Sequence, residues 1–360
     1  MTERDLIQQI QKLTLQQGRG SVVQGIGDDC AVVTKDQKDV WLLTMDTLVE
    51  SVHFDCSWHP PYLLGRKAVT VNVSDVAAMG GKPVFALLSL GLPADFEPAW
   101  ATELNRGIHD ACCQYGCLLI GGDTVCSPEK VSLTLTLIGE AAQDQVVYRH
   151  GACLGDTIWV SGVLGYAAAG LAWYQSSQTG QTGNIPPLIT PIQSCQSCQS
   201  CQSCQSCSPP EYPAEYPLEL KPCLDAHLNP EARTGLGRVL VQTGCVHAMM
   251  DISDGLATDL AHLCQQSKVG ARVEAEKLPG RQGLACAADL LQKKTRDWML
   301  AGGEDYELLF TASPQDSQII QDVAAEQGIR VSPVGTITEQ GQGVCDKEQQ
   351  ISFQGFDHFA

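Results

Sequence analysis

The chain has 360 residues, of which 44% are hydrophobic, so it can bury a large core and we expect two domains. It carries 23 basic against 41 acidic residues, and its formal net charge of -18 argues against nucleic acid or an anionic membrane as a partner. The first residues, MTERDLIQQIQKL, carry charges where a signal peptide needs an apolar core, and no apolar run approaches membrane-spanning length. We therefore expect a cytoplasmic protein.

In the first part of the chain, apolar spacing predicts short alternating elements. Residues 62–80 fit two patterns, because Val69, Val71 and Val73 alternate like a strand while the length favours a helix. As a helix, the segment places Asn72 and Asp75 on one face. We predict helices over 4–16, 62–80 and 100–115, and strands over 30–33, 40–45, 83–92, 118–120 and 131–138.

A domain boundary is expected near Arg149, which gives an N-terminal domain over 1–148 and a C-terminal domain over 149–360. We predict strands over 157–161, 245–252, 271–275, 307–311 and 329–337. We predict helices from the turn at 162–165 through Tyr174, over 229–242, over 284–291 and over 315–327. A further helix is predicted to begin after Ser253 or Asp254, either of which would serve as its N-cap. Because strands alternate with helices in both halves, the pattern predicts an α+β or α/β fold with two related layouts.

A low-complexity insertion is predicted at about 175–222. Five of the 17 cysteines lie there in tandem Gln-Ser-Cys units, at 195, 198, 201, 204 and 207. This cysteine spacing suits thiolate metal binding, whereas the polar composition favours a disordered surface insertion produced by repeat expansion. We favour the second interpretation, and we expect the remaining cysteines to be reduced thiols.

Acidic residues recur where apolar runs end. Gly25–Asp29 is a glycine turn with two adjacent carboxylates, which repel each other unless a cation lies between them. Any one of these acids, taken alone, is typical of a turn or a helix cap. Taken together, they indicate a site for magnesium, which prefers oxygen ligands. The acids concerned are Asp29, Asp46, Asp75, Asp123 and Asp251.

Several common catalytic motifs are absent from the sequence. It contains no GxxxxGK[ST] phosphate loop, no kinase-type HRD segment, no GxSxG nucleophile elbow and no HExxH zinc motif. Its eight histidines do not pair at ligand spacing. A nucleotide, if used, must therefore be bound in another way.

Seven segments in order resemble the thiamine-monophosphate kinase family, which belongs to the superfamily of aminoimidazole ribonucleotide synthase and selenophosphate synthetase. They are GIGDDCAVV, TMDTLVESVHF, NVSDVAAMGGKP, IGGDT, DISDGLATDL, GGEDYELLF and GFDHF. The resemblance covers nearly the whole chain except the insertion. It implies two α/β domains, with the N-terminal strands joining those of a partner in a dimer-spanning β-barrel and the C-terminal α/β domain packed behind.

The resemblance also implies ATP-dependent phosphorylation of thiamine monophosphate to thiamine diphosphate, the last step of thiamine diphosphate synthesis. Direct in-line transfer with several Mg²⁺ ions, no acid–base residue and a homodimer are expected. One alternative is another small-molecule, ATP-using enzyme of the same superfamily. Another is a non-enzymatic metal-binding protein that uses the cysteine repeat.

Carried over by position, the family's site residues fall into three groups. The implied metal ligands are Asp29, Thr44, Met45, Asp46, Asp75, Asp123, Asp251 and Asp254. The implied ATP contacts are Gly122, Asp123, Arg149 and Ser253, and the implied substrate contacts are His53, Glu304 and Phe356. Asn105 stands where we expect an aromatic residue against the adenine.

Overall fold

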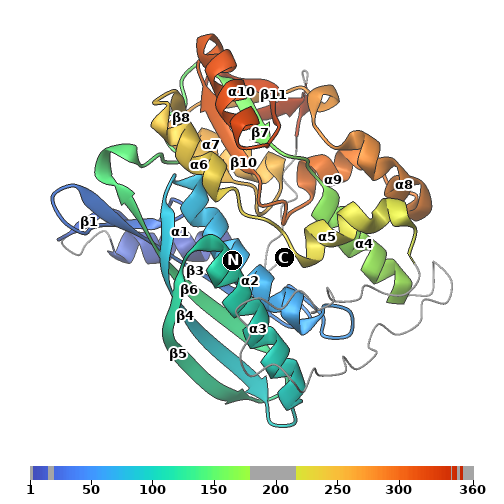
Figure 1. The fold of residues 1–360 in the computed structure, drawn as a ribbon. Coiled ribbons are helices and arrows are strands. Elements are labelled where there is room, and N and C mark those ends of the chain that lie inside the picture. The colour runs from blue at the N-terminus through green and yellow to red at the C-terminus, as the bar shows by residue number, and fades with distance from the viewer. Residues whose placement is uncertain (1–2, 15–19, 179–215, 342, 347–348, 352–360) are drawn as a thin grey trace.

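The computed structural model describes residues 3–14, 20–178, 216–341, 343–346 and 349–351. Their strands form two sheets, one in each half of the chain (Figure 1). The five tandem cysteines and Phe356 lie outside the described residues. No helix in the described ranges is long and apolar enough to cross a membrane.

The first sheet is mixed, with the strand order β1-β2-β3-β6-β4-β5. Its strands are β1 (Val22–Gln24), β2 (Ala31–Thr34), β3 (Asp39–Val49), β4 (Lys82–Pro93), β5 (Leu118–Ser127) and β6 (Ser132–Ala142). Along β6 buried and half-buried residues alternate, because one face of the sheet packs on helices. Those helices are α2 (Pro61–Ala78) and α3 (Pro98–Tyr115), and α1 (Glu3–Thr14) precedes the sheet.

Helix α2 lies between the two sheets and is buried on nearly all sides, including its polar residues Lys67, Asn72 and Ser74. It contacts α3 and the first sheet on one side, and α6 and β8 of the other half on the other. Two glycines allow α2 and α3 to approach closely. A Cβ on Gly65 would lie 2.1 Å from the Leu104 carbonyl oxygen, and one on Gly107 would lie 1.9 Å from that of Tyr62.

The second sheet has the order β13-β12-β9-β11-β7-β10-β8 and helices on both faces. Its strands are β7 (Thr157–Ser161), β8 (Val246–Asp251), β9 (Gly270–Val273), β10 (Leu308–Ala312), β11 (Val331–Thr338), β12 (Val344–Asp346) and β13 (Gln349–Gln350). One face packs on α4 (Tyr166–Gln178), α5 (Lys221–Leu228), α7 (Leu256–Ser267), α8 (Arg281–Leu291) and α9 (Thr295–Ala301). The other packs on α6 (Thr234–Gln242) and α10 (Ser317–Glu326).

The predicted insertion is shorter than expected at both ends. Helix α4 continues to Gln178, and the described chain resumes at Tyr216, which packs against the core of the second half. Helices α4 and α5 contact each other closely, since a Cβ on Gly170 would lie 2.2 Å from the Cys223 carbonyl oxygen. The two ends of the insertion therefore leave from one helix pair.

Three local predictions are wrong. Asp46 does not end its strand, because β3 continues to Val49 in register with β6. The strand predicted over 118–120 is too short, because β5 continues through GGDT to Ser127 and pairs in parallel with β4. Helix α7 has neither Ser253 nor Asp254 as its cap; its N-cap is Gly255.

Within the described residues, the strands of the first sheet do not close into a barrel on their own. Among the described residues, the first sheet has open edges at β1 and β5. Strand β5 is exposed along nearly all of its length, including the large apolar residues Leu118, Ile120 and Val125. The two-domain α/β architecture is as predicted, and the dimer-spanning barrel remains a prediction.

Candidate active site

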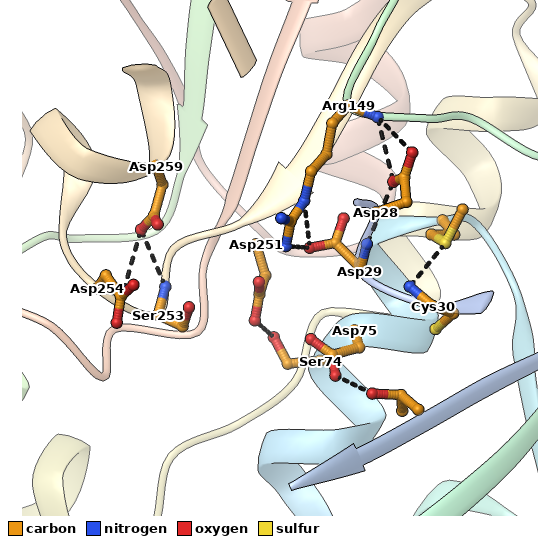
Figure 2. Close-up of polar contacts among 12 residues, drawn as sticks. Asp28, Asp29, Cys30, Ser74, Asp75, Arg149, Asp251, Ser253, Asp254 and Asp259 are labelled. Atoms are coloured by element: carbon orange, nitrogen blue, oxygen red, sulfur yellow. Dashed lines mark hydrogen bonds and ion pairs between the residues drawn. The ribbon is translucent and has the colours of Figure 1, made fainter. Parts of the chain in front are cut away.

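Three carboxylates from distant parts of the chain meet between the two sheets. Asp29 follows the glycine turn, Asp75 lies on α2 and Asp251 ends β8. One oxygen of each lies within 4.8 Å of the others (Figure 2). The site therefore requires both halves of the chain.

This cluster is short of positive charge. Arg149 donates to Oδ1 of Asp29 through Nε at 3.1 Å and Nη2 at 2.6 Å. The other oxygen of Asp29, Oδ2, is buried and accepts no hydrogen bond from any described residue. Burial, followed by the neighbouring charge of Asp29, raises the pKa of Asp251 to about 7. Burial and the charges of Asp46 and Asp251 raise the pKa of Asp75 as well.

An unpaired carboxylate oxygen among crowded acids fits a hard divalent cation, whose ligands are oxygens. Neutral partners fix the orientation of two of the acids. Ser74 Oγ donates to Asp251 Oδ2 at 2.6 Å, and Thr44 Oγ1 donates to Asp75 Oδ2. Because each acid then has one oxygen fixed by a hydroxyl, the other is left for a cation.

Asp28 supports the site through the backbone. Its carboxylate accepts hydrogen bonds from the backbone N–H of Arg149, at 3.2 and 3.3 Å to its two oxygens, and from that of Asp29 at 3.2 Å. Burial and the charge of Asp29 raise its pKa to about 7. Asp28 thus holds the Arg149 segment against the glycine turn.

Asp46 and Asp254 form a second acidic group. Burial and the charge of Asp254 raise the pKa of Asp46 to about 6. The Asp46 backbone N–H donates to Asn72 Oδ1 at 3.0 Å, so Asn72 and Asp75 both face β3, as their spacing predicts. The turn that carries Ser253 and Asp254 is held by Asp259, whose Oδ2 accepts both of their backbone N–H groups at 3.1 Å (Figure 2).

Three further predicted residues, Met45, Asp123 and Gly122, lie outside both acidic groups. Met45 alternates with Thr44 and Asp46 on β3, so its side chain points to the opposite, exposed face. Asp123 is exposed on β5 and accepts a hydrogen bond from the Thr124 backbone at 2.9 Å. Gly122 has a φ of 154°, and a Cβ there would lie 1.8 Å from the Leu88 carbonyl oxygen.

Glu304 lies in a buried polar network beside α2. Its Oε1 forms an ion pair with Lys67 Nζ at 2.7 Å, and its Oε2 contacts His227 Nδ1 at 3.0 Å. Lys67 is fully buried and also donates to the His227 carbonyl oxygen at 3.1 Å. These partners keep Glu304 ionised and hold its pKa well below the usual range against the opposing effect of burial. His53, also expected near the substrate, accepts a hydrogen bond at Nδ1 from the Val49 backbone at 3.0 Å.

Sequence reasoning missed Ser74, Asp259, Lys67 and His227. A signal was available for Lys67, because a single lysine in the apolar run KAVTVNV needs a buried anion as partner. Asp259, an acid in the first turn of α7, also had a signal. Ser74 and His227 gave none, since their partners are distant in sequence.

The two halves match two family models. Residues 27–141 match the AIR synthase related protein, N-terminal domain, and residues 217–347 match the AIR synthase related protein, C-terminal domain. Together with the two-sheet fold and the acidic cluster between the sheets, these matches define the class: AIR synthase related, two-domain α/β proteins.

Curated relatives narrow the class further. The thiamine-monophosphate kinase of Aquifex aeolicus (strain VF5) is 34% identical over 93% of this chain and 92% of its own length. That of Bacillus subtilis (strain 168) is 30% identical over 100% of both chains. The chain belongs to the thiamine-monophosphate kinase family. A solved structure described as "AaThiL complexed with AMPPCP and TMP" is 33% identical, with a TM-score of 0.80 over 99% of this chain and 97% of that one.

Proposed function

We propose that this protein transfers the γ-phosphate of ATP to thiamine monophosphate and so forms thiamine diphosphate. The observation that carries the proposal is the full-length similarity to a structure whose description names TMP and AMPPCP, an ATP analogue. The buried acids between the two sheets would hold the Mg²⁺ ions that such a transfer needs.

Magnesium ions are the expected partners of these acids. The proposed ligands are Asp29, Thr44, Met45, Asp46, Asp75, Asp123, Asp251 and Asp254, with Met45 acting only through its backbone carbonyl. The unpaired Oδ2 of Asp29 and the raised pKa values of Asp75 and Asp251 support this assignment. When bound, the ions would screen the charge of two polyanionic substrates and stabilise the charge that develops during transfer.

The proposed contacts with ATP and with thiamine monophosphate involve other residues. ATP would be contacted by Gly122, Asp123, Arg149 and Ser253, and thiamine monophosphate by His53, Glu304 and Phe356. Arg149, fixed by Asp29 and Asp28, provides a positive charge at the acidic cluster. Glu304, kept ionised by Lys67, is a suitable partner for the cationic thiazolium ring, and the Phe356 ring could add a cation–π contact.

No general base is required. The acceptor is a phosphate monoester with a second pKa of about 6, so it is already largely ionised at neutral pH. The task of the protein is then to align the two phosphates for direct, in-line transfer without a phosphoenzyme.

We also propose a homodimer in which the first sheet joins that of a second copy. Its support is the exposed edge strand β5 with its apolar residues Leu118, Ile120 and Val125. An uncovered apolar edge of this length favours pairing with another strand.

The direct test is a coupled assay with purified protein, ATP and thiamine monophosphate, with and without Mg²⁺. We expect thiamine diphosphate to form only when Mg²⁺ is present. ATP turnover with a different small-molecule acceptor, and none with thiamine monophosphate, would instead identify a sister enzyme of the superfamily. Metal binding without any ATP turnover would favour the non-enzymatic alternative.

A further inference from the structure

A second group of metal-ligating side chains lies away from the acidic cluster. Cys153 and Asp156 belong to the segment before β7, and His247 is the second residue of β8. One ligand atom of each lies within 4.8 Å of the other two. His247 and Asp251 are four residues apart on β8, or about 13 Å at about 3.3 Å per residue, so this group is distinct from the proposed magnesium site.

Backbone contacts hold the segment that carries Cys153 and Asp156. The N–H groups of Gly151 and Ala152 donate to Ser267 Oγ at 3.1 and 3.2 Å. At the other end, the Ile337 N–H donates to the Asp156 carbonyl oxygen at 2.9 Å. The segment is therefore positioned before any ligand binds.

Close backbone packing holds the segment against β8. Gly151 has a φ of 123°, and a Cβ there would lie 2.4 Å from the His247 carbonyl oxygen. Only glycine permits this approach, which brings the segment within reach of the His247 side chain.

The contacts among the three side chains leave the thiol available. Asp156 Oδ2 accepts from the Cys153 backbone N–H and contacts His247 Nδ1, each at 2.8 Å. The Cys153 thiol donates to the Gly151 carbonyl oxygen at 3.4 Å rather than to the imidazole. This arrangement does not resemble a nucleophile activated by histidine, in which the thiol and the ring share a proton.

We propose that Cys153, Asp156 and His247 bind a thiophilic divalent cation of the Zn²⁺ class. A thiolate, an imidazole and a carboxylate form a donor set that suits Zn²⁺, whereas Mg²⁺ prefers oxygen ligands alone. Three protein ligands leave a fourth, tetrahedral position for water.

Binding requires only small movements. Bonds of about 2.0–2.1 Å place two ligand atoms about 3.3 Å apart around a tetrahedral ion, compared with 2.8 Å between His247 Nδ1 and Asp156 Oδ2 here. Cys153 is exposed and the His247 side chain is 34% exposed, so both can adjust. The thiol proton leaves to solvent, and His247 binds as neutral imidazole through Nδ1, with its proton on Nε2.

The test uses the full-length chain with the five tandem cysteines, Cys195, Cys198, Cys201, Cys204 and Cys207, changed to serine, so that they cannot bind the probe. This protein is titrated with Co²⁺ in excess Mg²⁺, and the thiolate-to-cobalt charge-transfer band is recorded. We expect a saturable band at one Co²⁺ per chain that Zn²⁺ abolishes, together with a Tm raised by Zn²⁺.

Cys153→Ala should remove the band, and His247→Gln should weaken Co²⁺ binding at least tenfold. Cys113→Ala, which removes an exposed cysteine on α3, should leave both unchanged. Circular dichroism melting in the absence of metal checks that each variant is folded. Absence of the band in the parent protein, or a band that survives Cys153→Ala in a folded variant, would refute the site.

Discussion

Lys67 of α2 is a fully buried lysine. Its ammonium group is fully buried, and its charge is balanced by Glu304, whose side chain is 24% exposed. Burial of a charge is tolerated only with such a partner. The pair also joins α2 to the loop before β10, and hence the two halves of the chain.

Replacing Lys67 with methionine should destabilise the protein, because Glu304 and His227 would lose their cation. We expect about 3 kcal/mol, the lower end of the cost of breaking a buried ion pair, since Glu304 is partly exposed. Urea unfolding measures this cost. The double variant Lys67→Met/Glu304→Gln should recover part of the loss, and a double variant as unstable as the single one would contradict the ion-pair explanation.

Asp46→Asn tests the second acidic group. The change keeps the size of the side chain and removes the mutual repulsion with Asp254, so the fold should persist with an equal or slightly higher Tm. Turnover in the coupled assay should fall at least a hundredfold if Asp46 holds a metal. Near-normal turnover would remove Asp46 from the proposed ligands.

At the scale of elements, the α2–α3 contact depends on glycine. Gly107→Ala would place a methyl group against the Tyr62 carbonyl oxygen, at 1.9 Å before any relaxation, and must push the helices apart. We expect a loss of about 1–3 kcal/mol in the free energy of unfolding.

The matched control is Gly235→Ala in α6, where the nearest atom belongs to the movable Gln327 side chain at 2.7 Å. There, the better helix propensity of alanine should leave stability unchanged or raise it by up to about 1 kcal/mol. Equal effects of the two changes in thermal melting would show that close helix packing is not the cause.

Elements with a clear local period were predictable from sequence. Leu133, Leu135 and Leu137 alternate and lie buried on β6, and the strand predicted over 245–252 is found as β8, which ends at Asp251. The GGDT segment was not predictable as a strand, because its extended form depends on pairing with β4, more than 30 residues earlier. Glycines that would mark a turn in isolation here allow close approach to a neighbouring strand.

The candidate site was likewise predictable from the sequence only in part. Of the five acids expected at one site, the structure brings Asp29, Asp75 and Asp251 together, whereas Asp123 lies exposed on β5, and metal binding stays a prediction. The hydroxyl of Ser74 and the network around Lys67 depend on how α2 packs between the sheets, and no local pattern encodes that packing.

At the scale of the whole molecule, the acids between the sheets link stability to pH. Folding raises the pKa of Asp28, Asp46 and Asp251 from 3.8 to about 7, 6 and 7. The folded state therefore binds protons more tightly than the unfolded chain, and this stabilisation is complete below about pH 4 and lost as the pH rises through 6 to 7.

Without metal, the Tm should accordingly fall between about pH 4 and pH 7 and change little above that range. Mg²⁺ binds the ionised form, so the rise in Tm that it produces should be larger at pH 8 than at pH 5.5. Thermal melts in matched buffers, with Mg²⁺ or with a chelator, measure both effects. A rise in Tm that is independent of pH would show that these carboxylates are not where Mg²⁺ binds.

The contact between α4 and α5 has a consequence for the history of the gene. The 37 residues from 179 to 215 start and end at this one packed helix pair, so their number does not set the distance that they must span. Doubling the length of such a connection costs only about 0.6 kcal/mol in closure entropy. The copy number of the Gln-Ser-Cys unit is then nearly free to drift, and we expect closely related strains to differ in it while the helices on either side stay the same.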